Sequence, residues 1–255
     1  MGTALVTGAS AGLGRAFAIE LAARGHDVVL VARDEGRLQQ IADELRRRHG
    51  VHAEALGADL ADRGQLQRVA DRVGDAARPV DLVVNNAGFG IKAGFVNGDI
   101  AEEERALDVM VRAVMVLSHA AAEPMRRRGH GAILNVSSVA SFATVGTYSA
   151  DKAWTTVFSE GLSSDLAGSG VTVTALCPGF IRTEFHDRAQ MNMGWLPEGM
   201  WLDAHRVALD ALHDVAAGHV VSVPSLQYRL LVGLARSVPR PVVRRVSRRV
   251  STVRR

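Results

Sequence analysis

Apolar and polar residues follow two different periods along this chain, which predicts an ordered series of strands and helices. Short runs rich in valine, leucine and alanine, bounded by glycine or polar residues, have the length and composition of buried strands. The longer segments between them repeat apolar residues every three or four positions, as amphipathic helices do. The predicted strands are Thr3–Thr7, Asp27–Val31, His52–Leu56, Asp81–Val84, Gly131–Val136, Val171–Leu176 and Val220–Val223. The predicted helices lie near residues 12–24, 35–49, 62–77, 101–128, 148–167 and 203–217.

The alternation of strands and helices predicts the fold class. Continuously apolar strands have both faces buried, and helices that connect successive strands make those strands parallel. We therefore predict an α/β fold with one doubly wound domain and a mostly parallel sheet. The chain has 255 residues, of which 47% are hydrophobic and 22% charged, and this suits one globular domain with a large core. We expect this domain to span residues 1–235.

Positive charge is concentrated at the C-terminus. Residues 236–255 contain eight arginines and no acidic residue, while the rest of the chain carries 22 basic and 27 acidic residues. Just before this segment, Leu226, Leu230 and Leu234 fall on one helical face. A basic amphipathic segment can lie on an anionic membrane surface. The alternative is a docked helix followed by a solvated arginine-rich tail, and nucleic acid is not expected as a partner.

Several classes of protein are disfavoured. No apolar run reaches the ~18–20 residues that span a bilayer. The N-terminal residues lead directly into a strand and lack the basic and apolar regions of a signal peptide. Cys177 is the single cysteine, so no internal disulfide can form, and no metal-binding motif is present. We expect a cytoplasmic protein without a metal site.

A glycine-rich turn follows the first predicted strand. The sequence Thr7-Gly-Ala-Ser-Ala-Gly-Leu-Gly14 leads directly into a helix. Glycines at 8, 12 and 14 let the backbone turn tightly and approach a pyrophosphate, which the free N–H groups of the helix attract. The turn therefore predicts a dinucleotide site.

The end of the second strand indicates which dinucleotide binds. An NAD site places an acidic residue there for the ribose hydroxyls, but Ala32 and Arg33 occupy this position. A guanidinium suits a 2′-phosphate. Asp34 follows, and we expect it to cap the next helix. The sequence thus favours NADP(H) over NAD(H).

A tyrosine and a lysine stand four residues apart at Tyr148 and Lys152, in a chain that has only two of each. On a helix these positions share one face, so the ammonium can stand beside the phenol. A nearby cation lowers the pKa of a phenol from about 10, which suits a general acid or base. The alternative is an exposed helix pair without chemistry.

Four motifs in this order resemble the short-chain dehydrogenase/reductase family over about residues 3–223. They are Thr7-Gly-x-x-x-Gly-x-Gly14, Asn85-Asn-Ala-Gly88, Ser138 with Tyr148-x-x-x-Lys152, and Pro178-Gly179 followed by Thr183. The resemblance implies a single Rossmann domain with strand order 3-2-1-4-5-6-7. It also implies contacts to the cofactor from Gly8, Ser10, Gly12, Leu13, Gly14, Arg33, Asp59, Leu60, Asn85, Gly88, Tyr148, Lys152, Pro178, Ile181 and Thr183.

The implied contacts divide the cofactor into parts. Asp59 and Leu60 would border the adenine, and Asn85 and Gly88 would line the groove. The nicotinamide end would be held by Pro178, Ile181 and Thr183. Two plainer interpretations exist. Asp59 could cap the helix that begins near Asp62, and Pro178-Gly179 could be a simple turn.

The resemblance also implies the catalytic roles. Tyr148 would donate a proton to the substrate carbonyl, or accept one during alcohol oxidation. Lys152 would lower the pKa of the phenol and bind the nicotinamide ribose, and Ser138 would orient the carbonyl. Ser137 is adjacent, but the alignment favours Ser138. The family further implies a homodimer or homotetramer formed through helices 101–128 and 148–167.

Two features depart from the family pattern. Ser138 and Tyr148 are ten positions apart, which is shorter than usual, so the loop 139–147 should be tight and should reshape the mouth of the substrate site. Met110 stands where the family has an asparagine that holds a proton-relay water, largely through its backbone carbonyl. We predict a weakened or rewired relay.

Residues 182–202 are apolar without clear periodicity. They include Met191, Met193, Trp195, Pro197, Met200 and Trp201. We interpret this segment as a lid over an apolar ligand, with a packed irregular insert as the alternative.

Together, these features predict an NADP(H)-dependent carbonyl reductase or alcohol dehydrogenase acting on an apolar substrate. Ketosteroids, 3-oxoacyl thioesters and other hydrophobic ketones all remain candidates. The alternative hypothesis is a non-catalytic NADP(H)-binding sensor or scaffold that is attached to a membrane by its basic tail.

Overall fold

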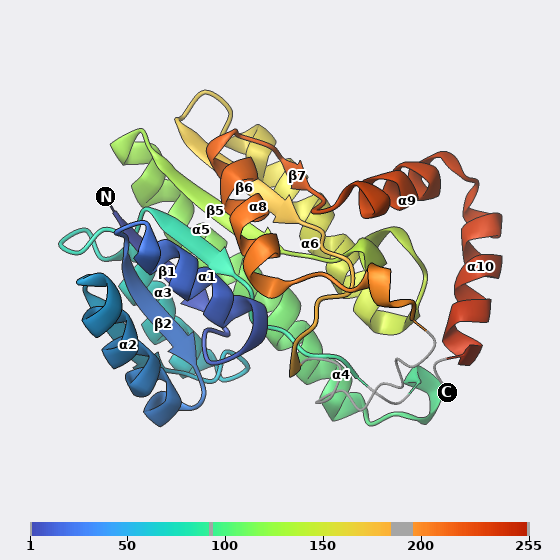
Figure 1. The fold of residues 1–255 in the computed structure, drawn as a ribbon, viewed down its shortest axis with the longest axis horizontal. Coiled ribbons are helices and arrows are strands. Elements are labelled where there is room, and N and C mark those ends of the chain that lie inside the picture. The colour runs from blue at the N-terminus through green and yellow to red at the C-terminus, as the bar shows by residue number, and fades with distance from the viewer. Residues whose placement is uncertain (1, 92–93, 185–195, 254–255) are drawn as a thin grey trace.

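A computed structural model describes residues 2–91, 94–184 and 196–253 (Figure 1). Its centre is one parallel sheet of seven strands in the order β3-β2-β1-β4-β5-β6-β7. The strands are β1 (Thr3–Thr7), β2 (Asp27–Ala32), β3 (Ala53–Gly57), β4 (Leu82–Asn85), β5 (Gly131–Val136), β6 (Val171–Leu176) and β7 (Val221–Ser222). The predicted fold class, strand order and approximate strand positions are confirmed.

Helices cover both faces of the sheet. The main ones are α1 (Gly12–Ala23), α2 (Glu35–His49), α3 (Arg63–Gly74), α4 (Ile100–Leu107), α5 (Ala113–Arg128), α6 (Gly146–Asp165), α8 (Ala204–Ala216), α9 (Leu226–Ser237) and α10 (Arg240–Val253). One apolar core joins α1, α2 and α8 to the sheet, and a second joins α3, α5 and the end of α6. The strands are buried between these cores, which explains their uninterrupted apolar sequences.

Aspartates fix where several helices begin. The side chain of Asp34 accepts the N–H of Arg37 at 2.9 Å, and Asp62 accepts the N–H of Gln65 at 2.8 Å. Each satisfies a backbone donor that the first helical turn leaves unpaired. Asp34 is therefore the cap of α2, as predicted. Asp62 is the cap of α3, so the plainer interpretation of Asp59 as that cap is wrong.

The predicted helix 101–128 is divided into three parts. Between α4 and α5, residues Asp108–Arg112 form a π-helical turn, and the N–H of Ala113 donates to the carbonyl of Asp108. A π turn inserts one residue into an α-helix and often marks a functional site. The apolar period of the sequence does not reveal one inserted residue, so a single helix was predicted.

The C-terminal segment is more ordered than the predicted tail. Two helices, α9 and α10, follow β7, and α10 occupies most of the arginine-rich residues. Tyr228 and Val232 of α9 are buried against a third small core that contains Cys177 and Val223. Within the described residues, no helix is long and apolar enough to cross a bilayer.

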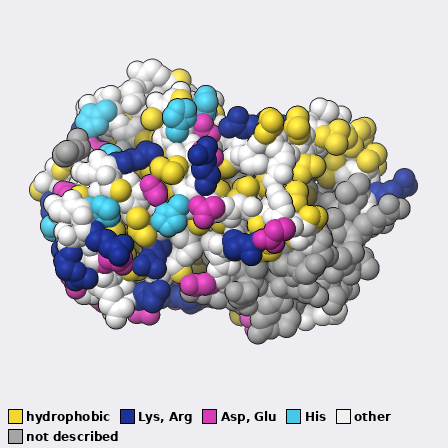
Figure 2. All heavy atoms as spheres, in the orientation of Figure 1, with side chains coloured by type: hydrophobic (Ala, Val, Ile, Leu, Met, Phe, Trp, Pro, Cys, Tyr) yellow, Lys and Arg dark blue, Asp and Glu magenta, His cyan; other side chains and the backbone are white. Residues whose placement is uncertain are grey.

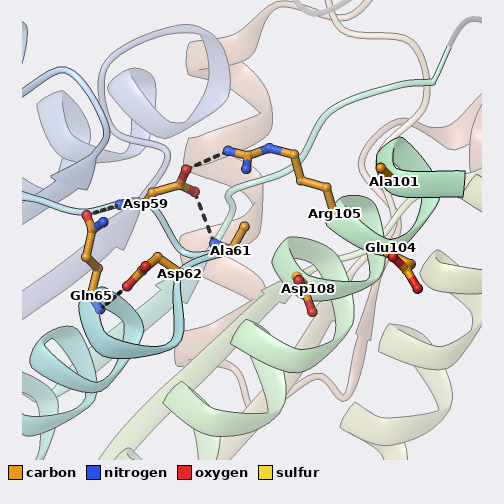
Figure 3. A pocket seen from close by; sticks show the side chains of 8 residues that line it. All are labelled: Asp59, Ala61, Asp62, Gln65, Ala101, Glu104, Arg105 and Asp108. Atoms are coloured by element: carbon orange, nitrogen blue, oxygen red, sulfur yellow. Dashed lines mark hydrogen bonds and ion pairs between the residues drawn. The ribbon is translucent and has the colours of Figure 1, made fainter. Parts of the chain in front are cut away.

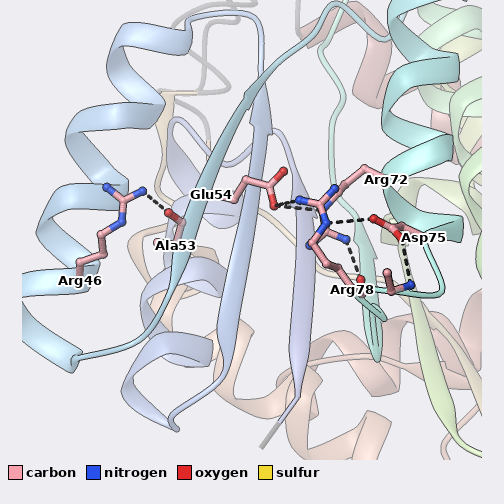
Figure 4. Close-up of polar contacts among 7 residues, drawn as sticks. Arg46, Ala53, Glu54, Arg72, Asp75 and Arg78 are labelled. Atoms are coloured by element: carbon pink, nitrogen blue, oxygen red, sulfur yellow. Dashed lines mark hydrogen bonds and ion pairs between the residues drawn. The ribbon is translucent and has the colours of Figure 1, made fainter.

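Polar side chains cover the outer edge of the sheet at β3 (Figure 4). The guanidinium of Arg46 in α2 donates to the carbonyl of Ala53, and Nε of Arg72 in α3 donates to the Glu54 carboxylate at 2.9 Å. Arg72 is only 9% exposed and also donates to the carbonyl of Arg78 at 2.9 Å. These contacts attach the flanking helices to the edge strand, where open pairing groups would otherwise invite association with another chain.

Candidate active site

The glycine-rich turn between β1 and α1 forms a backbone cradle. Gly8 and Gly12 have φ values of +68° and +52°, which favour glycine. A Cβ atom on Gly14 would lie 2.5 Å from Nδ2 of Asn86 and closer still to the carbonyl oxygen of Gly8. No side chain fits there, so the turn presents bare backbone and the N-terminus of α1 at the carboxyl end of the sheet. These residues fit the pyrophosphate of a dinucleotide.

The end of β4 is joined to this turn by hydrogen bonds. The hydroxyl of Thr7 accepts the N–H groups of Asn86 at 2.9 Å and Ala87 at 3.0 Å. The side chain of Asn86 donates to the Thr7 carbonyl at 2.9 Å. The start of the loop after β4 is thus fixed beside the glycine turn. The sequence motif gave no indication of this role for Asn86.

The side chain of Asn85 lies inside the molecule. It is 3% exposed and donates to Asn135 Oδ1 at 2.8 Å and to Ser118 at 3.2 Å. Asn135 in turn donates to Ser159 of α6 at 3.0 Å. This buried network connects β4, β5, α5 and α6 directly behind the site. The side chain of Asn85 therefore supports the site from behind.

Two arginines, one at the end of β2 and one in the first turn of α2, lie near the glycine turn. Arg33 is exposed, as expected of a residue that binds a phosphate group. Nε of Arg37, in the first turn of α2, donates to the carbonyl of Ser10 at 3.3 Å. Sequence analysis missed Arg37. Its place one helical turn after Arg33, in a helix capped by Asp34, was the signal that could have revealed it.

Asp59 lines an open polar pocket of about 440 Å³ at the carboxyl end of β3 (Figure 3). Arg105 of α4 reaches across and contacts its carboxylate at 2.6 Å. Burial raises the pKa of Asp59, but the hydrogen bonds from Arg105 and from the N–H of Ala61, with the charge of Arg33, outweigh this and lower the pKa overall. The charge of the Asp59 carboxylate is therefore balanced by the guanidinium of Arg105 from α4. Arg105 is a pocket residue that the sequence did not reveal.

The two adjacent serines after β5 have different surroundings. Ser137 is 2% exposed, and its hydroxyl lies 2.7 Å from both the carbonyl of Lys152 and the hydroxyl of Thr156 in α6. Ser138 is half-buried and caps the short helix Val139–Phe142, where its hydroxyl accepts the N–H of Ala140 at 3.1 Å. Ser137 is thus committed to holding α6 in place, whereas Ser138 lies at the surface of the site.

Tyr148 and Lys152 lie one turn apart near the start of α6, as their spacing predicts. The ammonium of Lys152 is 5.7 Å from the ring centroid of Tyr148 and donates to the carbonyl of Val136 at 2.8 Å. Tyr148 is half-buried, and Lys152 is only 5% exposed. The exposed, inert helix pair that we considered as an alternative does not describe this lysine.

Burial lowers the pKa of Lys152 to about 8, against the opposing attraction of Asp151. At neutral pH the ammonium remains charged and favours the ionised form of a neighbouring phenol. Asp151 is itself 4% exposed, and burial raises its pKa. A buried carboxyl therefore lies next to the buried ammonium, a feature that sequence analysis did not anticipate.

Met110 lies in the π turn with 1% exposure. Its carbonyl accepts the hydroxyl of Thr155 at 3.4 Å. A Cβ atom on Gly88 would lie 3.3 Å from the Met110 sulfur and 3.6 Å from the ammonium of Lys152, so these three residues surround one spot. Methionine thus fills with apolar atoms the space beside the ammonium.

The segment after β6 contacts both the glycine turn and α9. Pro178 is buried, and a Cβ atom on Gly12 would lie 3.2 Å from Thr183, so Thr183 lies against the glycine turn. A Cβ atom on Gly179 would overlap the ring of Tyr228. Pro178-Gly179 is therefore more than a simple turn, because the glycine makes room for an aromatic ring. The other predicted contacts Leu13, Leu60 and Ile181 are buried.

The predicted lid is described only at its ends. Met191, Met193 and Trp195 lie outside the described residues. Ile181 and Leu202 form an isolated parallel bridge that closes the segment at its base. Trp201 packs edge-on to Phe180, with ring centroids 6.3 Å apart. The lid function stays a prediction.

Known proteins are similar to this chain in architecture and in sequence. A short-chain dehydrogenase from Sphingobium yanoikuyae in complex with NADPH is 36% identical, with a TM-score of 0.85 over 93% of this chain and 94% of that one. The bulky-bulky ketone specific alcohol dehydrogenase from Comamonas testosteroni is 30% identical, with a TM-score of 0.80 over 94% and 96% of the two chains. The 3-oxoacyl-acyl-carrier-protein reductase FabG of Escherichia coli is 34% identical over 71% of this chain and 74% of that protein.

The family assignment follows from these similarities and from the motifs on the parallel sheet. The family model described as short chain dehydrogenase matches residues 2–193. The chain belongs to the short-chain dehydrogenase/reductase family of oxidoreductases.

Proposed function

We propose that this protein is an NADP(H)-dependent oxidoreductase that interconverts a carbonyl and a secondary alcohol of an apolar substrate, with Tyr148 as the general acid and base. The observation that carries the proposal is the buried ammonium of Lys152 beside the half-buried phenol of Tyr148. Together they form a proton donor next to a dinucleotide cradle.

The cofactor supplies or accepts the hydride at its nicotinamide. The glycine turn would hold the pyrophosphate with its backbone N–H groups. Arg33 and Arg37 would neutralise the 2′-phosphate, because both residues follow the carboxyl end of β2. Arg37 is already oriented by its hydrogen bond to the carbonyl of Ser10. The chain thus contributes placement and electrostatic complementarity.

Proton transfer falls to the residues around α6. During reduction, Tyr148 would donate its phenolic proton to the substrate oxygen, and Ser138 would donate a hydrogen bond that orients the same oxygen. Lys152 stays charged below about pH 8 and stabilises the phenolate that remains. In the direction of alcohol oxidation, the same phenolate would accept the proton.

The proton relay behind Lys152 is the weakest part of this machinery. Met110 retains a backbone carbonyl, but the hydroxyl of Thr155 approaches it at 3.4 Å, and the methionine side chain places apolar atoms near the ammonium. We propose that proton supply from this side is weakened or rewired, so Tyr148 would exchange its proton more through the substrate mouth.

An apolar substrate fits the residues around the mouth. Trp201 and Phe180 form an aromatic pair at the closed base of the segment that we interpret as a lid. The related enzymes named above include a bulky ketone alcohol dehydrogenase and a 3-oxoacyl reductase. These support a hydrophobic ketone or 3-oxoacyl thioester as the substrate class.

Replacing Tyr148 by phenylalanine tests the catalytic role. The ring and its packing remain, but the transferable proton is lost. We expect at least a ~100-fold loss of kcat for NADPH-dependent reduction across a panel of hydrophobic ketones, with NADPH affinity nearly unchanged in a fluorescence titration. Retained turnover would refute the assigned role. Absence of NADPH consumption by the parent protein with every carbonyl tested would instead favour the non-catalytic sensor.

Replacing Arg33 by alanine tests the cofactor preference. We expect NADPH affinity to fall at least ~10-fold, since a charge-assisted contact to phosphate is lost, while NADH affinity changes little. Arg47→Ala, which removes an exposed arginine from the far end of α2, is the matched control. Equal losses for the two cofactors would show that Arg33 does not read the 2′-phosphate.

A further inference from the structure

The outer face of α9 is apolar, although it is exposed. Leu226, Leu230 and Leu234 are 71%, 67% and 63% exposed, and Leu231 is 49% exposed. Figure 2 shows hydrophobic side chains gathered at the upper right, where α9 lies in Figure 1. A surface helix normally turns its polar side outward. Here both sides of the helix are apolar, because Tyr228 and Val232 fill the inner side.

This leucine face, defined as Leu226, Leu230, Leu231 and Leu234, adjoins a positively charged helix without acidic residues. From residue 226 to the C-terminus the sequence contains no Asp or Glu. Arg240, Arg244 and Arg245 of α10 are exposed, and further arginines follow at 248 and 249 in the sequence. Apolar side chains next to unbalanced cations complement one surface in particular, the anionic interface of a lipid bilayer.

Helix α9 is firmly attached to the rest of the protein. The hydroxyl of Tyr228 donates to the carbonyl of Met200 at 2.8 Å and accepts the N–H of Phe180 at 3.2 Å. Nε of Arg229 donates to the carbonyl of Val223 at 2.9 Å. The leucine face is therefore presented by a docked helix, and its exposure is not the result of a detached tail.

Helices α9 and α10 lie against the loop that follows Ser138. The guanidinium of Arg236 is 4.9 Å from the ring centroid of Phe142, and the N–H of Thr144 donates to the hydroxyl of Ser247 in α10 at 3.1 Å. A surface that binds α9 and α10 would therefore lie beside the mouth of the candidate active site.

We propose that the leucine face of α9 and the arginines of α10 form a peripheral docking surface for an anionic lipid membrane. The leucines enter the boundary between headgroups and acyl chains, and the arginines contact lipid phosphates. This surface is independent of the proposed reaction, because it is assigned from exposure and charge alone. Its binding is measured without substrate or cofactor.

Co-sedimentation of the full chain with vesicles tests the proposal. We expect binding to vesicles of phosphatidylglycerol and phosphatidylcholine, little binding to phosphatidylcholine alone, and release at 1 M salt, where the Debye length falls to about 3 Å. Absence of binding to the anionic vesicles would overturn the proposal.

Matched double variants identify the surface. Leu230→Ser with Leu234→Ser should weaken vesicle binding at least ~10-fold, because two aliphatic side chains no longer enter the apolar boundary. Val96→Ser with Ile100→Ser removes side chains that are 91% and 62% exposed elsewhere, and should leave binding within about twofold. Equal losses in the two variants would overturn the proposal.

The charge has its own matched pair. Arg244→Gln with Arg245→Gln should weaken binding roughly 10- to 30-fold, whereas Arg126→Gln with Arg127→Gln, at the exposed end of α5, should change it little. Light scattering of the leucine variant in the absence of lipid provides the last control. A smaller particle mass with unchanged vesicle binding would show that the leucine face joins two copies of the chain, and would overturn the membrane proposal.

Discussion

Gly179 and Tyr228 are predicted to be energetically coupled, although 49 positions separate them in the sequence. A Cβ atom at Gly179 would lie closer than 3.0 Å to three atoms of the Tyr228 ring. That ring is 2% exposed, and its hydroxyl is fixed by Met200 and Phe180, so it cannot withdraw without losing both hydrogen bonds. The backbone of Gly179 is not in the left-handed region, so the effect of alanine comes from this overlap.

The expected destabilisation is bounded by two known effects. Overpacking a core costs about 1–3 kcal/mol, and complete loss of a buried aromatic ring costs about 3–5 kcal/mol. We expect Gly179→Ala to lower the free energy of unfolding by about 3 kcal/mol. For a chain of this size, that corresponds to a decrease in Tm of roughly 6–12 °C.

A double-mutant cycle isolates the cause. Unfolding in urea is measured for the parent, Gly179→Ala, Tyr228→Ala and the double variant. If the overlap with the ring is responsible, Gly179→Ala should cost less than about 0.5 kcal/mol once the ring is absent. Tyr228→Phe is the control, because it keeps the ring and loses the hydroxyl, so alanine at 179 should still be costly in that background.

The outcome that would refute the packing explanation is an equal cost of Gly179→Ala in the parent and in Tyr228→Ala. Fluorescence titration with NADPH on the same variants separates the alternative role. If Gly179 is required for close approach of the cofactor, alanine should reduce NADPH affinity in every background, including those in which stability is unaffected.

Three further predictions follow from the site. Gly14→Ala should abolish detectable NADPH binding in a titration, because its Cβ atom would overlap the backbone carbonyl that forms the cradle; preserved affinity would contradict the pyrophosphate assignment. Asp151→Asn should gain stability relative to the parent as the pH rises above 4, because burial raises the pKa of Asp151 and its ionisation in the folded state is unfavourable. The same variant should lose reductase activity at a lower alkaline pH than the parent, because the attraction that raises the pKa of Lys152 is lost. Arg105→Ala should cost about 1 kcal/mol or less at pH 7. The difference should shrink as the pH falls below 3.8, because the pKa of Asp59 is lowered from that value in the folded state and its carboxylate takes up a proton only there. Urea unfolding of both proteins at pH 7 and pH 3 measures the difference, and a pH-independent difference would contradict the ion pair.

Local patterns predicted most of the fold. Each strand is marked by a short apolar run between polar boundaries, and its neighbours in the sheet follow from the family's strand order. The glycine turn and the Tyr148 and Lys152 pair were also local signals, since each depends on spacing within a few residues. What these patterns share is that the chain need not be folded for them to be recognised.

The remaining features depend on contacts between distant segments. Arg105 approaches Asp59 from a helix 46 positions away, and Gly179 is explained only by a ring from α9. The outward orientation of Leu230 could not be predicted either, because a helix that is apolar on both sides gives no indication of which side is buried. In that helix, Tyr228 has the larger side chain, and its hydroxyl has backbone partners, so it occupies the inner side.

At Met110, the sequence and the structure explain different features of the site. The sequence identifies the missing asparagine, and in the family the side chain of that residue helps to fix a local helix bend. The bend is present, as the π turn Asp108–Arg112. Arg112 forms an ion pair with Asp108 at 3.0 Å and donates to the carbonyl of Ala61 at 2.7 Å, and these contacts hold the turn from the side of the Asp59 pocket. Backbone geometry is therefore maintained without the asparagine, and the effect of methionine is confined to the polarity of the space beside Lys152, where a relay water would need hydrogen-bonding partners.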